Sequence, residues 1–324
     1  MPPVIVAVAE TAEGTLTKLS TEVATLARSL AAASGGTAVG LVVDAAPDAA
    51  ATELAGYLPR VVSVAGNGDQ TWAPQVAAEV QRLTGEGVTH VLVGATTDGR
   101  DVAGALVGLL GWGLLANASG VTWKDASFVV RASVLAGKAI TDSILTGPTG
   151  IVTVSGGSVT AEAAATPGAV ETRDATAGLL PSVAVLDRVA EAGAEASLEE
   201  ARVVVVGGRG VGGPEGFAVV SELASLLGGV VGATRASVDA GWIAYARQIG
   251  QTGKIVKPAL YLGLGVSGAM QHRVGMQSSA TIVAINRDPD APIAAVADLF
   301  VVGDLFEVGP ALAAELRARR GQGG

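Results

Sequence analysis

The chain has 324 residues, of which 49% are hydrophobic and 45 are glycine, and this is enough material for two domains with cores of their own. Its net charge of −9 excludes sequence-independent nucleic-acid binding, which needs a basic face. Because the chain has no cysteine and only two histidines, disulfides, thiolate catalysis, cysteine-ligated iron–sulfur clusters and multi-histidine metal sites are excluded, so redox chemistry would need an organic cofactor.

The first half of the chain alternates between strands and helices. Apolar runs and segments with helical spacing of apolar residues follow one another at 4–9, 17–33, 37–43, 61–64, 72–83 and 88–94. Strands that are apolar throughout are typical of a sheet buried on both faces. The sequence therefore predicts a parallel sheet with helices on both sides.

The segment 102–123 is uncharged over 22 residues, which is long enough to span a bilayer. Its repeated glycines, with Asn117 and Ser119, favour instead a buried helix of about two turns, a glycine break and a buried strand. The N-terminus has no basic region and is typical of a first strand, not of a signal peptide. We therefore expect a cytoplasmic protein that is not embedded in a membrane.

The pattern then changes, and helices are missing between the next strands. Three short strands joined by turns are predicted at 127–132, 138–145 and 151–154, and they indicate an antiparallel extension of the same sheet. A stretch rich in Ala, Glu and Gly follows at 187–202. The predicted organisation is an N-terminal α/β domain that packs on a partner subunit, a linker and a C-terminal domain, at 1–190, 191–201 and 202–324.

A second α/β pattern fills the C-terminal part. Its strands are predicted at 203–206, 230–232, 259–263, 281–285 and 299–302, and its helices at 214–227, 267–274 and 306–318. The fold class is therefore α/β, with two doubly wound domains, mainly parallel sheets and a Rossmann-like second domain. Ligands of such sheets bind at the carboxyl ends of the strands.

Two glycine loops connect strands to helices in this second domain. The segments 208–213 and 263–268 both match G-x-G-x-x-G, the dinucleotide-binding pattern. The acidic residue expected about 20 residues after the first match is missing, and Arg235 stands there instead, which would suit the 2′-phosphate of NADP. Either both loops serve one ligand or one loop is structural, and an NAD(P)-dependent dehydrogenase stays an alternative.

A third loop, 248–254, has the sequence Q-I-G-Q-T-G-K and is typical of loops that wrap an anionic cofactor. Nearby polar residues allow two interpretations each. Arg235 either pairs with Asp239 or meets an aromatic or anionic ring. His272 is either a hydrogen-bonded core histidine or a positive or donating group beside a cofactor atom. Asn286 either starts a turn before Pro289 or contacts ribose or adenine.

Six motifs of the second domain occur in the order of a known family. They lie at 207–210, 232–242, 248–254, 265–272, 284–289 and 303–306, and together they resemble the FAD domain of the electron transfer flavoprotein alpha subunit. The resemblance covers 203 to the C-terminus. The first half fits more loosely, through 131–137 and 155–158.

The resemblance implies FAD as the cofactor and a heterodimer with an electron transfer flavoprotein beta subunit. It implies an electron carrier without a substrate-turnover site, which takes electrons one at a time from acyl-CoA dehydrogenases of fatty acid β-oxidation and related flavoproteins. A membrane quinone oxidoreductase would accept them. A bifurcating, NADH-linked flavoprotein is an alternative, and so is a nucleotide-binding module that has lost flavin chemistry. We expect no nucleic-acid partner and no metal.

The resemblance also implies a set of cofactor-binding residues. Arg235 would lie against the flavin ring, Thr252 would donate towards flavin N5 and His272 would lie near flavin O2, and these three would tune the flavin potential. Asn286 and Asp304 would hold the AMP portion. The full set is Arg209, Thr234, Arg235, Gln248, Ile249, Gly250, Gln251, Thr252, Gly265, Ser267, Gly268, Gln271, His272, Asn286 and Asp304.

Overall fold

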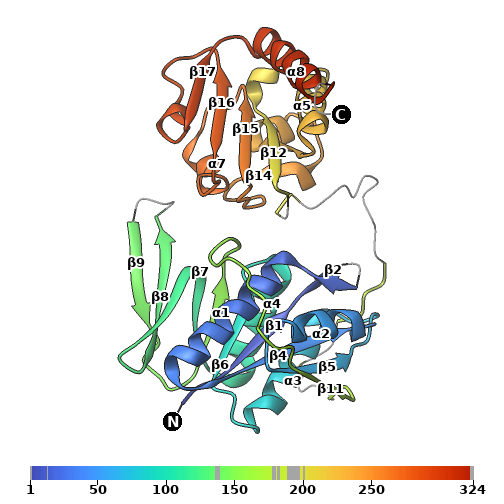
Figure 1. Ribbon diagram of the computed structural model, residues 1–324, viewed down its shortest axis with the longest axis vertical. Coiled ribbons are helices and arrows are strands. Elements are labelled where there is room, and N and C mark those ends of the chain that lie inside the picture. The colour runs from blue at the N-terminus through green and yellow to red at the C-terminus, as the bar shows by residue number, and fades with distance from the viewer. Residues whose placement is uncertain are drawn as a thin grey trace. The chain divides into compact units, whose positions relative to one another are not determined.

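The computed structural model describes residues 2–321 except 13, 136–138, 177–179, 181–182, 188–197 and 200. The chain forms two compact units, Met1–Val189 and Ala190–Gly324, and each contains a large sheet (Figure 1). Most of the predicted linker, 191–201, lies outside the described residues. In the part that is described, no helix is both long and apolar enough to cross a membrane.

The first unit is built on a nine-stranded sheet. Its strands are β1 Val4–Ala9, β4 Thr37–Asp44, β5 Arg60–Ala65, β6 His90–Gly94, β7 Gly113–Lys124, β8 Ser127–Val134, β9 Ala139–Ile144, β10 Gly150–Val154 and β11 Ala169–Arg173, and a separate small hairpin pairs β2 Thr11–Ala12 with β3 Thr15–Leu16. The order across the sheet is β11-β5-β4-β1-β6-β10-β7-β8-β9. All neighbours are parallel except β7–β8 and β8–β9.

Helices cover both faces of this sheet, as the apolar strands predict. They are α1 Lys18–Ser34, α2 Asp48–Ala55, α3 Trp72–Thr84 and α4 Thr97–Leu110. The core on one face contains buried residues of α1 and α2, and the core on the other face contains those of α3 and α4. The hydroxyls of Thr17 and Thr96 accept backbone N–H groups in the first turns of α1 and α4, which fixes where these helices begin.

Four expectations for this unit were wrong. Helix α2 was missed because its alanine-rich sequence lacks a clear apolar periodicity. Helix α4 begins at Thr97 and spans 14 residues, so it is longer than predicted, and β7 is mostly exposed instead of buried. Strand β10 pairs in parallel with β6 and β7, so only β8 and β9 form the antiparallel extension.

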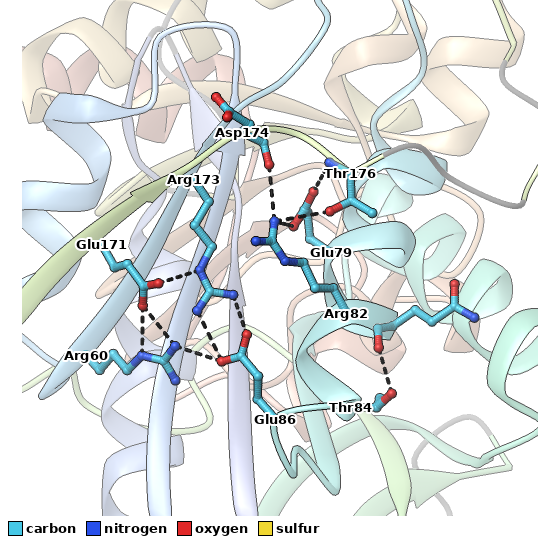
Figure 2. Close-up of polar contacts among 10 residues, drawn as sticks. Arg60, Glu79, Arg82, Thr84, Glu86, Glu171, Arg173, Asp174 and Thr176 are labelled. Carbon is cyan, nitrogen blue, oxygen red and sulfur yellow. Dashed lines mark hydrogen bonds and ion pairs between the residues drawn. The ribbon is translucent and has the colours of Figure 1, made fainter.

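An ion cluster fastens the edge strand β11 to its neighbours (Figure 2). Arg60 of β5 bonds Glu86 at 2.8 Å and Glu171 at 2.9 Å. Arg173 of β11 bonds the same two carboxylates at 2.5 and 2.7 Å. The two arginines lower the pKa of Glu86 to about 2, with the hydrogen bond from Arg173 as the largest cause. Each charge thus meets two opposite charges.

We expect Glu86→Gln to lower the free energy of unfolding at pH 7 by about 1 kcal/mol, a value reduced for solvent screening of this half-exposed group. A carboxylate with a lowered folded-state pKa stabilises the fold above its unfolded pKa and loses that effect as the pH falls. The wild type should therefore lose stability between about pH 5 and pH 2, and the variant should lose less. Urea unfolding at several pH values measures both effects, with the exposed Glu162→Gln as control. Equal acid sensitivity in wild type and E86Q would contradict the prediction.

The second unit is built on a six-stranded, all-parallel sheet of order β14-β13-β12-β15-β16-β17. Its strands are β12 Val203–Gly207, β13 Val230–Thr234, β14 Gln248–Ile249, β15 Leu260–Leu264, β16 Ile282–Asn286 and β17 Leu299–Val302. Its helices are α5 Phe217–Leu227, α6 Arg235–Asp239, α7 Met270–Val274 and α8 Leu305–Gly321, with short 3-10 turns η1 Arg209–Val211, η2 Tyr245–Arg247 and η3 Pro292–Ala295. The doubly wound parallel fold predicted for both halves is confirmed.

The two sheets differ at the point where the strand order reverses. In the first unit this point lies between β1 and β6, and the protein's own side chains fill it. Thr96 Oγ1 donates to Glu10 Oε1 at 2.6 Å, and the backbone N–H of Glu10 donates to Ser20 Oγ at 2.8 Å. A carboxylate in this crevice disfavours an anionic ligand.

Candidate functional site

The reversal point of the second sheet lies between β12 and β15, and both predicted glycine loops meet there. The N–H of Gly208 donates to Leu264 O at 2.9 Å, and the N–H of Gly210 donates to Gly265 O at 3.0 Å. A Cβ atom on Gly210 would lie 2.6 Å from the Cα of Gly265. The two loops therefore pack backbone against backbone at one point of the carboxyl edge, where ligands of such sheets bind.

The first loop lacks the strand–turn–helix context of a nicotinamide dinucleotide fingerprint. After β12 the chain makes the 3-10 turn η1, and helix α5 begins only at Phe217, later than predicted. A fingerprint would place a helix N-terminus directly behind the glycines. This geometry, with Arg235 in place of the ribose-binding acid, removes the support for a simple NAD(P) site.

The loop after β14 is tightly hydrogen-bonded. Lys254 N–H donates to Gln248 O at 2.8 Å, and Gln251 N–H donates to Gln271 O at 2.8 Å. The buried Gln248 also donates from Nε2 to Thr252 Oγ1 at 3.1 Å. Because Thr252 accepts this bond, its own hydroxyl hydrogen remains able to donate outwards. Thr252 is exposed, so a ligand at this edge can reach it.

His272 is buried, and both of its ring nitrogens bond to the protein. Nδ1 lies 3.0 Å from Ile249 O and Nε2 lies 2.8 Å from the Tyr261 hydroxyl. Burial lowers the pKa of His272 to about 4, so the ring is neutral at pH 7. Both ring nitrogens thus have protein partners, as in the hydrogen-bonded core histidine of one interpretation, and the place of His272 near flavin O2 stays a prediction.

Arg235 and Asn286 also adopt their structural alternatives. Arg235 Nε lies 3.1 Å from Asp239 Oδ2, and both side chains are largely exposed. Such a surface pair holds the guanidinium weakly, so it can exchange partners. Asn286 Oδ1 accepts the N–H of Asp288 at 3.1 Å, while its Nδ2 donates to Val266 O at 2.9 Å. Asn286 thus forms the turn and fastens it to the loop after β15.

The helix after β15 is shorter than predicted, and this changes the role of Ser267. Helix α7 starts at Met270, its N-cap is Ala269, and it has five residues. Ser267 lies before it in the loop and is exposed. A helix this short contributes little dipole, so Ser267 is a loop hydroxyl and not a helix cap.

All the predicted site residues lie at the carboxyl ends of the strands of one sheet. Contacts join Gln248 with Thr252, Gln251 with Gln271, and Ile249 with His272. Arg209 is exposed on η1. Asp304 accepts the N–H of Phe306 at 2.8 Å in the first turn of α8. The exposed members of the set are Arg209, Arg235, Gln251, Thr252, Ser267, Gln271 and Asp304.

Three residues that support this edge were missed from the sequence. Ser237 Oγ donates to Gly207 O at 3.3 Å and lies 3.3 Å from the hydroxyl of Thr234, joining the ends of β12 and β13. The Tyr245 hydroxyl donates to Thr252 O at 2.7 Å. The sequence analysis treated Tyr261 only as part of an apolar strand. Its place two positions before Gly263, where the glycine loop begins, is the signal that could have marked it as a site residue.

A cavity of about 630 Å³ lies elsewhere, in the first unit, at the carboxyl ends of β4 and β5. Its described lining includes Asp44, Asp98 and Asp101 but neither Lys nor Arg. Carboxylates without a cation are a poor environment for phosphate groups. The glycine-rich edge of the second sheet is therefore the better place for an anionic cofactor.

Comparisons with known proteins identify both units. The electron transfer flavoprotein domain model matches residues 5–178, and the electron transfer flavoprotein FAD-binding domain model matches 197–277. The chain is 40% identical to the electron transfer flavoprotein subunit alpha of Mycobacterium leprae over 320 residues, which are 96% of this chain and 98% of that protein. It is 34% identical to the same subunit of Bacillus subtilis over 318 residues, 97% of each chain. The FAD-binding domain model contains the predicted residues from Arg209 to His272 but ends before Asn286 and Asp304.

Proposed function

Since the chain belongs to the electron transfer flavoprotein family as an alpha subunit, we propose that it holds FAD along the carboxyl edge of its second sheet and carries electrons singly between flavoprotein dehydrogenases, such as acyl-CoA dehydrogenases, and a membrane quinone oxidoreductase. One observation carries the proposal: the two glycine loops meet at the reversal point of that sheet. Ligands of doubly wound sheets bind at this point.

The residues present fit FAD. A Cβ on Gly208 would overlap the carbonyl of Gly265, so only glycine lets the two loops pack backbone against backbone at this edge. Exposed donors stand beside it, among them the guanidinium of Arg209 and the hydroxyl of Ser267. These groups suit a pyrophosphate. Thr252 and Arg235, towards the β14 side, would contact the flavin, and Asn286 and Asp304, at β16 and β17, the AMP portion.

Bound FAD supplies the electron-accepting group, which no side chain of this chain offers. The chain's own contribution is to bind and orient it. The Thr252 hydroxyl, held by Gln248 at 3.1 Å, is directed as a donor. Arg235 is always charged. It would leave its weak surface pair with Asp239 and oppose negative charge on the flavin ring. His272, being neutral, acts through the loop that it holds.

The test is the absorption spectrum of the chain purified with its beta subunit, recorded during stepwise reduction. We expect a yellow protein that accepts electrons in two resolved one-electron steps. A colourless protein that binds NAD(P)H would overturn the proposal. Direct reduction by NADH, with two flavins per heterodimer, would assign the complex to the bifurcating type instead.

The antiparallel arm formed by β8 and β9 offers a surface for the beta subunit (Figure 1). One face of β8 is buried through Phe128 and Val130. The opposite face of the arm exposes Ile140 by 70% and Ile144 by 57%. These two residues flank Asp142, which pairs across the strands with Arg131. Exposed β-branched side chains on a sheet are typical of a covered interface, and we propose that the beta subunit covers this face.

We expect Ile140→Asp combined with Ile144→Asp to weaken subunit association by about 30-fold or more, because two apolar side chains would leave the interface and two charges would need burial. Analytical ultracentrifugation of the heterodimer at falling concentration measures the change. Thr141→Asp, an exposed position on the other face of the same strand, is the control and should associate as the wild type does. Wild-type association of the double variant would show that the beta subunit binds elsewhere.

A further inference from the structure

Three buried groups at the carboxyl edge of the second sheet are joined by hydrogen bonds: the Tyr261 hydroxyl, the His272 ring and the Ile249 carbonyl. The distances are 2.8 Å from Tyr261 to Nε2 and 3.0 Å from Nδ1 to Ile249 O. A carbonyl oxygen only accepts hydrogen bonds, so the ring proton must be on Nδ1. In the neutral ring Nε2 is then an acceptor, and the Tyr261 hydroxyl must be its donor.

The surroundings of Tyr261 leave its ring little freedom. Its side chain is fully buried in the core that also contains Ile249. The ring lies along β15 over Gly263, where a Cβ atom would stand 3.0 Å from Tyr261 Cε1. A buried hydroxyl without a partner is costly, so the tyrosine fixes the ring that it meets. The strand therefore helps to hold the ring in place, whereas the Ile249 carbonyl, which can only accept, determines which nitrogen of His272 carries the proton.

The bond from His272 to Ile249 lies where β14 becomes the loop 248–254. Two backbone bonds join this loop and the segment just after it to α7 and the residue that follows α7: Gln251 N–H to Gln271 O, and Val256 N–H to Gly275 O, both at 2.8 Å. Gly275 contacts Gly250 so closely that a Cβ would lie 2.5 Å from the Gly250 nitrogen. Helix α7 and the loop thus pack closely together. Among the hydrogen bonds described here, the one from His272 Nδ1 to Ile249 O is the only side-chain bond between them.

We propose that Tyr261 is a positioning residue of the cofactor site: its hydroxyl donates to Nε2 and holds the His272 ring so that Nδ1–H meets the Ile249 carbonyl, and this bond fastens α7 to the loop that carries Gln251 and Thr252. The connection to FAD rests on the proposed function, whereas the hydrogen-bond chain does not. In the other ring form the proton would be on Nε2. The bare Nδ1 would then face the Ile249 carbonyl, and the lone pair of Nδ1 would repel that of the carbonyl oxygen. The loop would then have to move.

The ring form can be read directly, because His272 shares the chain with one other histidine, His90. When only this chain of the heterodimer carries ¹⁵N-labelled histidine, the spectrum contains two imidazole rings with two nitrogens each, and a His90→Gln variant assigns them. We expect His272 at pH 7 to show a protonated Nδ1 and a bare Nε2. Tyr261→Phe, which removes only the hydroxyl, should shift Nε2, which loses its donor, and change the Nδ1 signal as the ring loosens, while the ring proton stays on Nδ1 and the His90 signals stay unchanged. Tyr57→Phe in the first unit is the control.

A second readout connects the chain of bonds to the cofactor. Tyr261→Phe removes one buried hydrogen bond, so the variant should bind FAD about tenfold more weakly than the wild type. The two reduction potentials of the bound flavin should also shift. In a His272→Gln background the same change should add nothing, because the ring that transmits it is gone. A wild-type His272 with its proton on Nε2, an unaltered spectrum in Y261F, or equal effects of Y261F in both backgrounds would overturn the proposal. A protein without flavin but with the Nδ1–H ring would refute the proposed function alone.

Discussion

Gly265→Ala should abolish FAD retention and lower the free energy of unfolding of the second unit by about 3 kcal/mol. Two costs combine at this residue. Its φ of +62° is a left-handed conformation that strains a residue with a Cβ atom. The new Cβ would also lie 2.7 Å from the Cα of Gly210 and 2.9 Å from Leu305 Cδ2. The two glycine loops would have to separate, and the crevice that they form would be lost.

Gly212→Ala separates these two costs. Gly212 lies in the same region, after η1, with a φ of +78°, but a Cβ atom there would meet nothing within 4 Å. We expect a loss of about 1 kcal/mol from backbone strain alone, with FAD retained. Flavin absorbance after gel filtration and urea unfolding of both variants provide the comparison. If G212A releases as much FAD as G265A, conformational strain and not loop contact controls the site.

The sequence was sufficient for the fold because the strands carry their own burial pattern. The run Val4–Ala9 predicts β1 to both ends, since five of its six residues are buried. Strand β7 was predicted to be buried because its sequence is uncharged, but an uncharged sequence does not say whether a helix or another chain covers the strand. Helix α2 was missed since alanine packs closely without producing a periodic apolar face. Local pattern thus predicts elements that build the core and fails where a neighbouring surface decides.

The location of the site was predictable, but the state of its side chains was not. Motifs that follow strands of a parallel sheet must meet at its carboxyl edge, and the structure brings them there. The sequence left His272 open because its charge depends on burial, and because one of its hydrogen-bond partners is Tyr261, which lies 11 residues away and reads as a core residue. Arg235 was open for a similar reason: pairing with Asp239 is local, whereas contact with a ring depends on a ligand. Burial and partner choice are properties of the folded chain.

Gly99→Ala should lower the free energy of unfolding of the first unit by about 3 kcal/mol, for a reason tied to its closed crevice. Gly99 lies in the first turn of α4, where a Cβ would overlap Gly94 O and lie 2.9 Å from Glu10 Oε1. The side chain of Glu10 is fixed by Thr96 at 2.6 Å. The helix could accommodate the methyl group only by withdrawing from the end of β6 and breaking this contact.

Gly104→Ala, in the same helix, should have the opposite effect. A Cβ at Gly104 meets nothing within 4 Å, so the change only improves helix propensity and should stabilise α4 by up to about 1 kcal/mol. Tryptophan fluorescence reports on the first unit, because Trp72, Trp112 and Trp123 lie in it and only Trp242 lies in the second. If both variants melt alike, the reversal point of the first sheet is not closed as the structure shows, and a ligand there would have to be considered. Opposite shifts would mean that the reversal point of the first sheet is closed, which leaves the carboxyl edge of the second sheet as the candidate place for an anionic cofactor.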